Sequence, residues 1–141
     1  MSTRIESASE TVKNLFQLAL LARERSYSPY SEQKVGAAIL TTQGKIFVGC
    51  NVENSSYGAT ICAERVAIHN AISQIGQLKI VELMVVTHSS PAWPPCGMCL
   101  QVMAEFGEDI IIHTANIDGL LDTFYFKQLF PLAFTASHLT K

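Results

Sequence analysis

The order of apolar patterns along the chain is the feature that most constrains its fold. Five short apolar runs predict strands, at residues 35–41, 46–50, 80–87, 109–114 and 120–124. The first two runs flank a Thr-Gln-Gly-Lys turn and predict a hairpin. After the third run, the residue pattern predicts a helix before the next strand. A hairpin followed by alternating strands and helices implies a mixed sheet with helices on its faces. We therefore predict an α/β fold, a three-layer α/β/α sandwich around a mixed five-stranded sheet.

Four helices are expected around these strands. The first begins near Ser7 and Glu10, whose S-x-x-E spacing has the form of a capping box. It ends before Ser28, because a residue that precedes proline avoids helical angles. Thr60 is the expected N-cap of the second helix, and Gly76 is its expected C-terminal stop. The third and fourth helices are expected over residues 97–106 and 125–129.

Composition places the chain among globular proteins. Its 141 residues fit a single domain that spans residues 1–141. Apolar residues make up 48% and charged residues 16%, which excludes a disordered polyampholyte. The net charge of −2 argues against affinity for nucleic acid and gives no reason to expect membrane binding. No apolar run is long enough to span a membrane and the N-terminus does not resemble a signal peptide, so we expect a cytoplasmic protein with reduced cysteines.

Three of the four cysteines have the spacing of metal ligands. Cys96 and Cys99 form a C-x-x-C pair, which alone is compatible with a redox dithiol or with half of a zinc site. Cys62, at the start of another predicted helix, shifts the balance toward zinc, and three protein ligands leave one position open for water. Arg65 lies one turn after Cys62, where it either hydrogen-bonds the thiolates or is an ordinary surface arginine.

The residues around these cysteines resemble a known family. C-A-E-R at residues 62–65, followed by P-C-G-M-C at residues 95–99, is similar to the signature of the small zinc-dependent cytidine deaminases. The resemblance extends to residues 27–31, 35–38, 49–54 and 129–131, and so covers most of the chain between residues 26 and 134. It implies a cytidine deaminase-like fold.

The resemblance also implies how the metal and the proton are handled. Cys62, Cys96 and Cys99 correspond to the ligands of one Zn²⁺ per chain, and Glu64 corresponds to the proton shuttle between water and the pyrimidine ring. Spacing alone does not indicate this role, because Cys62 and Glu64 are two residues apart and do not share a helix face. The geometry requires zinc to lie beyond the N-terminal end of the helix.

Substrate contacts are implied in the same way. Asn51 and Glu53 match the pair that holds the ribose hydroxyls, and the backbone near Ala63 and Pro95 completes the base pocket. Phe134 matches the phenylalanine that a neighbouring subunit contributes, since chains of this length in the family are typically homotetramers with shared sites.

Several residues depart from the family pattern or lie outside it. Gln33 occupies a position where the family usually has an aromatic residue against the pyrimidine, and Leu100 stands where an arginine is common. Trp93 could line the mouth of the pocket, although a lone tryptophan in a loop more often serves packing, and Cys50 is expected to be a small buried residue. The four histidines are expected to be structural or exposed: His69, His88, His113 and His138.

The predicted function is hydrolytic deamination of cytidine or deoxycytidine to the uridine nucleoside and ammonia, a reaction of pyrimidine salvage. A close alternative is a deaminase of an N4-modified or antibiotic nucleoside such as blasticidin S. A polynucleotide-editing deaminase is disfavoured, because the chain has no basic stripe. An alternative from another class is a non-enzymatic zinc-stabilised module, in which Cys50 or a histidine closes the fourth coordination position.

Overall fold

The protein is built around one mixed six-stranded sheet. The computed structural model describes residues 2–139. The strands are β1 (Thr3–Arg4), β2 (Gly36–Thr41), β3 (Ile46–Cys50), β4 (Ile80–Thr87), β5 (Ile111–Asn116) and β6 (Leu120–Tyr125). They lie in the order β1-β6-β5-β4-β2-β3, in which only β4 and β5 run parallel. The predicted hairpin is therefore confirmed, with Ala38 opposite Val48.

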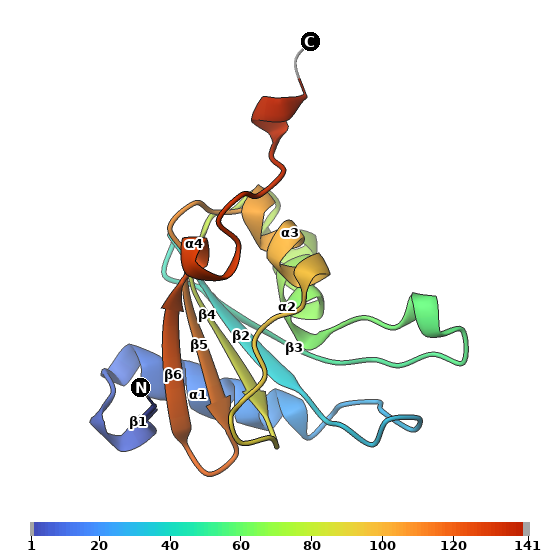
Figure 1. The fold of residues 1–141 in the computed structure, drawn as a ribbon, viewed down its shortest axis with the longest axis vertical. Helices are drawn as coiled ribbons and strands as arrows, with labels where there is room; N and C mark the ends of the chain where they lie inside the picture. The colour runs from blue at the N-terminus through green and yellow to red at the C-terminus, as the bar shows by residue number, and fades with distance from the viewer. Residues whose placement is uncertain (1, 140–141) are drawn as a thin grey trace.

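Helices cover both faces of this sheet. The α-helices are α1 (Glu10–Arg23), α2 (Ala63–Ile75), α3 (Gly97–Glu105) and α4 (Phe126–Leu129), and short 3₁₀ turns span Ile5–Ser7, Tyr57–Ala59 and Ala136–His138. Figure 1 shows α1 on one side of the sheet and α2 and α3 together on the other. Within residues 2–139, no helix combines the length and the apolar character needed to cross a membrane.

Two apolar cores explain the layers. Residues at alternate positions of a strand point to opposite faces, and both faces of β2 and β4 are apolar. Ala38 and Met84 pack with α1, whereas Ala37, Ile39 and Leu83 pack with α2 and α3. The predicted three-layer α/β/α sandwich is therefore confirmed.

The structure corrects three local predictions. The sheet has six strands rather than five, because residues 3–4 pair with β6; two polar residues carry no strand pattern, and only the tertiary fold brings a partner strand to them. The N-cap of α1 is Ser9 rather than Ser7, and its hydroxyl accepts a hydrogen bond from the Val12 N–H. The N-cap of α2 is Cys62 rather than Thr60, so a thiol lies at the tip of the helix.

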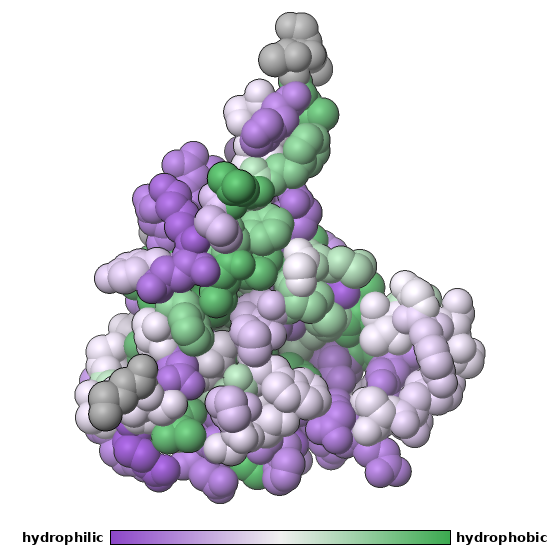
Figure 2. Space-filling view, in the orientation of Figure 1, coloured by the Kyte–Doolittle hydropathy of each residue, from purple (hydrophilic) through white to green (hydrophobic). Residues whose placement is uncertain are grey.

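The C-terminal segment stands apart from the sandwich. After α4 the chain rises away from the sheet, as Figure 1 shows. It carries large apolar side chains on its surface, including Leu132 (95% exposed) and Phe134 (55% exposed). Figure 2 shows apolar residues at the base of this segment and along it. Within one chain, these side chains have little to pack against.

A glycine sets the distance between β3 and α2. A Cβ atom at Gly49 would lie 2.4 Å from the Ala67 nitrogen and 2.6 Å from the Ala63 carbonyl oxygen. Both neighbours are backbone atoms of α2, so neither moves without the helix. Only glycine allows this close approach, which determines where the N-terminal end of α2 lies.

We predict that Gly49→Ala lowers the free energy of unfolding by about 3 kcal/mol, the upper end of the usual cost of overpacking, because β3 and α2 must separate. Urea unfolding followed by circular dichroism measures this difference. Gly58→Ala is the matched control, since a Cβ atom at Gly58 meets nothing within 4 Å. Equal unfolding midpoints for the two variants would show that the contact between β3 and α2 is loose.

Candidate active site

Two helix N-termini bring the three cysteines together. Cys62 is the N-cap of α2, Cys96 is the N-cap of α3, and Cys99 lies in the first turn of α3. Their sulfur atoms all lie within 4.8 Å of one another. The Cys62 and Cys96 Sγ atoms are 3.8 Å apart. A tetrahedral zinc ion with Zn–S distances of ~2.3 Å holds its sulfur ligands roughly 3.8 Å apart, so the cluster fits zinc.

Local electrostatics favour a thiolate at Cys62. The N-terminal ends of α2 and α3 carry partial positive charge, and neither Cys62 nor Cys96 uses its side chain to cap its own helix. Hydrogen bonds from Cys99, and then from Arg65 and Cys96, outweigh burial and lower the pKa of Cys62 to about 5. The hydrogen bond to Cys62, followed by burial, raises the pKa of Cys99. Metal binding by all three thiolates must therefore release the Cys99 proton.

Arg65 is part of this cluster rather than a surface residue. Its side chain is buried, and its Nη2 atom donates to the Cys62 sulfur at 3.4 Å. In the part of the chain that the structure describes, its Nε atom is buried and has no hydrogen-bond partner. The guanidinium thus places a positive charge beside the thiolates and offsets part of their negative charge.

Glu64 also lies at the cluster of three cysteines. It is only 5% exposed, and its Oε2 atom accepts from the Cys99 thiol at 3.7 Å. Burial, the largest cause, raises the pKa of Glu64 to about 7. Glu64 and Cys62 do not share a helix face, yet both reach the cluster because the cluster lies beyond the tip of α2. A carboxyl group with a pKa near neutrality is suited to accept and donate a proton.

A cavity of about 290 Å³ opens beside the cluster. Seven of the residues predicted for the site line it: Gln33, Asn51, Glu53, Cys62, Ala63, Glu64 and Cys96. Its polar groups gather at the cluster and on the loops, whereas Val35, Ile61 and Val85 give it apolar walls. The volume is close to the lower end of typical small-ligand pockets, ~300–1,000 Å³. A ligand of nucleoside size suits this space.

Four predicted site residues do not line the cavity: Cys99 and Arg65, which belong to the cysteine cluster behind it, and the expected substrate contacts Pro95 and Phe134. Pro95 is buried between Pro94 and Cys96, both of which do line it. Phe134 lies on the C-terminal segment, where its ring stacks on His138 with the centroids 5.4 Å apart. Its carbonyl oxygen accepts from the Gln101 side chain at 2.8 Å. Phe134 therefore contacts no substrate in the cavity of its own chain.

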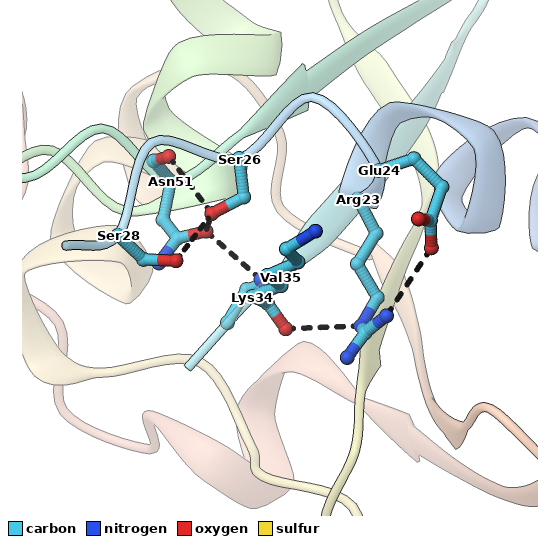
Figure 3. A network of polar contacts seen from close by, with 7 residues as sticks. All are labelled: Arg23, Glu24, Ser26, Ser28, Lys34, Val35 and Asn51. Carbon is cyan, nitrogen blue, oxygen red and sulfur yellow. Dashed lines mark hydrogen bonds and ion pairs between the residues drawn. The ribbon is translucent and has the colours of Figure 1, made fainter. Parts of the chain in front are cut away.

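Asn51 has structural contacts that the sequence did not reveal. Its Oδ1 atom accepts from the Val35 N–H at 2.8 Å and from the Ser26 hydroxyl, and its Nδ2 atom donates to the Gln33 carbonyl at 2.7 Å. Figure 3 shows the Oδ1 contacts, with Asn51 reaching across to the loop that connects α1 to β2. One side chain therefore ties both ends of this loop, residues 26–35, to the end of β3.

Glu53 fastens the tip of the same loop. Its carboxylate accepts from the Tyr30 N–H at 3.0 Å and from the Ser31 N–H at 3.2 Å. Desolvation acts to raise the pKa of Glu53, but the hydrogen bonds from Ser31 and Tyr30 lower it below its usual value. The two residues expected to bind ribose thus also hold the loop that carries Gln33 into the cavity.

Sequence reasoning missed several walls of the cavity. Ser31, Val35, Thr60, Ile61, Val85, Thr87 and Pro94 line it, and none was predicted. Trp93 also lines it, which is the less favoured of the two positions that the sequence allows for this residue. Val85 and Thr87 lie toward the carboxyl end of β4, and pockets of α/β proteins commonly open at that end of a strand. The predicted carboxyl end of this strand is therefore the one sequence feature that could have indicated Val85 and Thr87.

The remaining cysteine and the histidines lie outside the cavity. Cys50 is half-buried at the end of β3, and burial raises the pKa of its thiol. His113 is buried in the sheet, where its ring nitrogens contact the Glu82 carboxylate at 2.8 Å and the Thr123 hydroxyl at 2.9 Å. Neither the cavity nor the cluster of three cysteines includes any of these residues.

Comparison with known proteins agrees with this geometry. The family described as "Cytidine and deoxycytidylate deaminase zinc-binding region" matches residues 9–114. A cytidine deaminase of Halalkalibacterium halodurans is 42% identical over 126 residues, which cover 89% of this chain and 95% of that protein. A blasticidin-S deaminase of Bacillus cereus is 30% identical and covers 84% of this chain and 91% of its own length.

Solved structures of similar proteins have the same fold. The crystal structure of a cytidine deaminase from Burkholderia pseudomallei superposes with a TM-score of 0.83 at 38% identity, and covers 90% of this chain and all of that one. A cytidine deaminase structure from Mycobacterium tuberculosis has a TM-score of 0.76 at 33% identity over 91% of this chain and 99% of the other. Because the family match spans most of the chain and includes all three clustered cysteines, the chain belongs to the zinc-dependent cytidine and deoxycytidylate deaminase family.

Proposed function

We propose that the protein deaminates cytidine and deoxycytidine by hydrolysis and releases ammonia and the corresponding uridine nucleoside. The observation that carries this proposal is the position of Glu64, a buried carboxyl group 3.7 Å from one of three clustered thiols at the wall of a cavity. Membership of the family supports the same reaction. The first test is a panel of nucleosides, scored by loss of the cytosine absorbance.

Cys62, Cys96 and Cys99 would hold the zinc ion. When bound, zinc supplies Lewis-acid activation of water, whose pKa falls toward ~7. Three thiolates and Zn²⁺ sum to a net charge of −1, which weakens this activation. Arg65, through its contact with Cys62, and the two helix N-termini offset part of that charge. The protein thereby keeps a thiolate-rich site electrophilic.

Glu64 would move the protons. Its carboxylate accepts a proton from the attacking water and delivers it to N3 of the pyrimidine. As the C4–oxygen bond forms and the C4–nitrogen bond breaks, Glu64 helps to protonate the leaving amine, which departs as ammonia. Burial, which raises the pKa of Glu64 to about 7, suits both the basic and the acidic part of this cycle.

Asn51 and Glu53 would bind the ribose hydroxyls while holding the loop of residues 26–35. The amide of Asn51 has two N–H donors, and the Gln33 carbonyl uses one of them, which leaves the other for a ligand. Glu53 lines the cavity with a carboxylate that already accepts two backbone hydrogen bonds. The backbone near Ala63 and Pro95 would complete the base pocket.

The whole chain, residues 1–141, would form one catalytic domain that works in the cytosol as a homotetramer. The exposed apolar side chains of the C-terminal segment support such an assembly, because large exposed apolar surfaces commonly mark protein contacts. Phe134 cannot contact substrate within its own chain, and its exposed ring is available to a neighbouring subunit.

A second candidate substrate class is N4-modified or antibiotic nucleosides. Two observations favour it: the Bacillus cereus blasticidin-S deaminase matches 84% of this chain, and Gln33 lines the cavity. A glutamine amide offers a donor and an acceptor where an aromatic ring offers a flat apolar face. The nucleoside panel therefore includes blasticidin S beside cytidine and deoxycytidine.

Glu64→Gln should keep the zinc ion and lose turnover by about 10²–10⁴-fold, because the amide preserves the shape but cannot carry the proton. Zinc content per chain and the rate of cytidine deamination measure the two parts of this prediction. Loss of zinc together with activity would instead make Glu64 a ligand or a structural residue.

Replacement of each cysteine in turn should distinguish the metal ligands from a cysteine that does not bind the metal. Cys62→Ala, Cys96→Ala and Cys99→Ala should each lose zinc and unfold at lower temperature, because metal binding to the folded site is linked to folding. Cys50→Ala is the matched control and should keep its zinc, since Cys50 lies outside the cluster. If all four variants retain zinc equally, the ligand assignment is wrong.

Gln33→Phe should lower KM for cytidine and reduce tolerance of N4-substituted analogues. An aromatic ring adds stacking worth ~1–3 kcal/mol per base and removes the polar amide. The measurement is the ratio of kcat/KM for cytidine to that for an N4-alkylcytidine, in the wild type and the variant. Gln77→Phe, an exposed position after α2, is the control. An unchanged ratio would mean that Gln33 does not face the pyrimidine.

A further inference from the structure

One aromatic side chain lines the cavity. Among the cavity-lining residues in the described part of the chain, Trp93 alone has an aromatic ring, and it is the only tryptophan in the sequence. Its side chain belongs to neither apolar core and is 44% exposed. A large indole ring is therefore held at the cavity without being needed for packing of the core.

The backbone of Trp93 is held between the sheet and the cysteine cluster. The backbone N–H of Trp93 donates to the Thr87 hydroxyl at 3.4 Å, and Thr87 is a buried residue at the end of β4 that also lines the cavity. Pro94 and Pro95 connect Trp93 to Cys96, and their rings restrict the backbone between them. Trp93 is thus tied on one side to the sheet and on the other to a cysteine of the cluster.

The face of the indole ring and its Nε1–H group are available to a ligand. In the described residues 2–139, the indole forms no aromatic pair and its Nε1–H donates to no protein acceptor. The tyrosines nearest in sequence to the cavity loops do not line the cavity; Tyr30 and Tyr57 instead pack edge to face, with centroids 5.8 Å apart. The other apolar walls are aliphatic, and Gln33 offers an amide.

A flat pyrimidine ring gains most from an aromatic partner, since base–aromatic stacking is a major source of affinity for nucleobases. From the position and exposure of its ring, we propose that Trp93 is a substrate-contacting residue that packs against the pyrimidine and supplies the aromatic wall of this subunit's pocket. This inference rests on the proposed nucleoside substrate. It assigns base affinity to the loop between β4 and α3 rather than to Gln33.

The single tryptophan makes the contact directly measurable. Zinc-loaded Glu64→Gln protein is titrated with cytidine, uridine or ribose while tryptophan fluorescence is recorded. Both nucleosides should quench or shift the emission in a saturable way, whereas ribose, which lacks the ring, should not. Emission that stays unchanged at cytidine concentrations that saturate the wild-type enzyme overturns the proposal.

Kinetics of Trp93 variants provide the second arm. Trp93→Ala should raise KM for cytidine about tenfold, equivalent to 1.4 kcal/mol, with kcat within about twofold of the wild type. Trp93→Phe keeps an aromatic face and should raise KM by less. Tyr125→Ala, which removes an exposed aromatic ring outside the cavity, is the control and should leave KM unchanged. An unchanged KM in Trp93→Ala, or a fall in kcat without a change in KM, contradicts the assignment.

The two arms separate this inference from the proposed function. Cytidine that quenches the fluorescence without being deaminated by the wild type would overturn the function and support the contact. Turnover without quenching would support the function and overturn the contact. If Trp93→Ala fails to fold, the fluorescence titration and the Trp93→Phe kinetics decide the question without it.

Discussion

The convergence of two helix N-termini on one point is the constraint on which the site depends. α2 and α3 pack on the same face of the sheet, and each begins with a cysteine at its N-cap. Three sulfur atoms can then meet within 4.8 Å although Cys62 and Cys96 are far apart in sequence. Gly49 makes this possible for α2, because any larger residue would push the helix away from β3. The metal centre is therefore a consequence of how closely helices approach a sheet.

Burial then adjusts the charges of the groups gathered there. The same apolar packing that positions α2 removes Glu64 and Arg65 from water. For Glu64 the consequence is a pKa raised to about 7, and for Arg65 it is a guanidinium directed to the Cys62 sulfur. Consecutive residues of one helical turn thus place a carboxyl group of near-neutral pKa and a positive counter-charge at the cluster. Both properties require a desolvated environment, since water would screen the charge and return the carboxyl group to its ordinary pKa.

The substrate pocket is built differently from the metal centre. Its walls come largely from loops, and those loops are held by polar side chains rather than by an apolar core. Asn51 and Glu53 fasten residues 26–35, and Thr87 contacts the loop that carries Trp93. Loops of this kind tolerate changes that helices next to a metal do not. The chain therefore has the family's thiol cluster on its helices, whereas Gln33 and Trp93 lie on the loops that line the cavity.

Local patterns in the sequence determined most of the fold, including the hairpin, the alternation of strands and helices and the three layers, because periodicity reports which face of each element is apolar. The family motif also located the three cysteines and Glu64. Only the tertiary structure decided the rest. β1 exists because β6 offers it a partner, Arg65 is buried because α2 packs closely, and Asn51 ties a loop that lies far from it in sequence. Trp93 lines the cavity because its loop ends at Cys96. These features depend on contacts between distant segments, which no local pattern records.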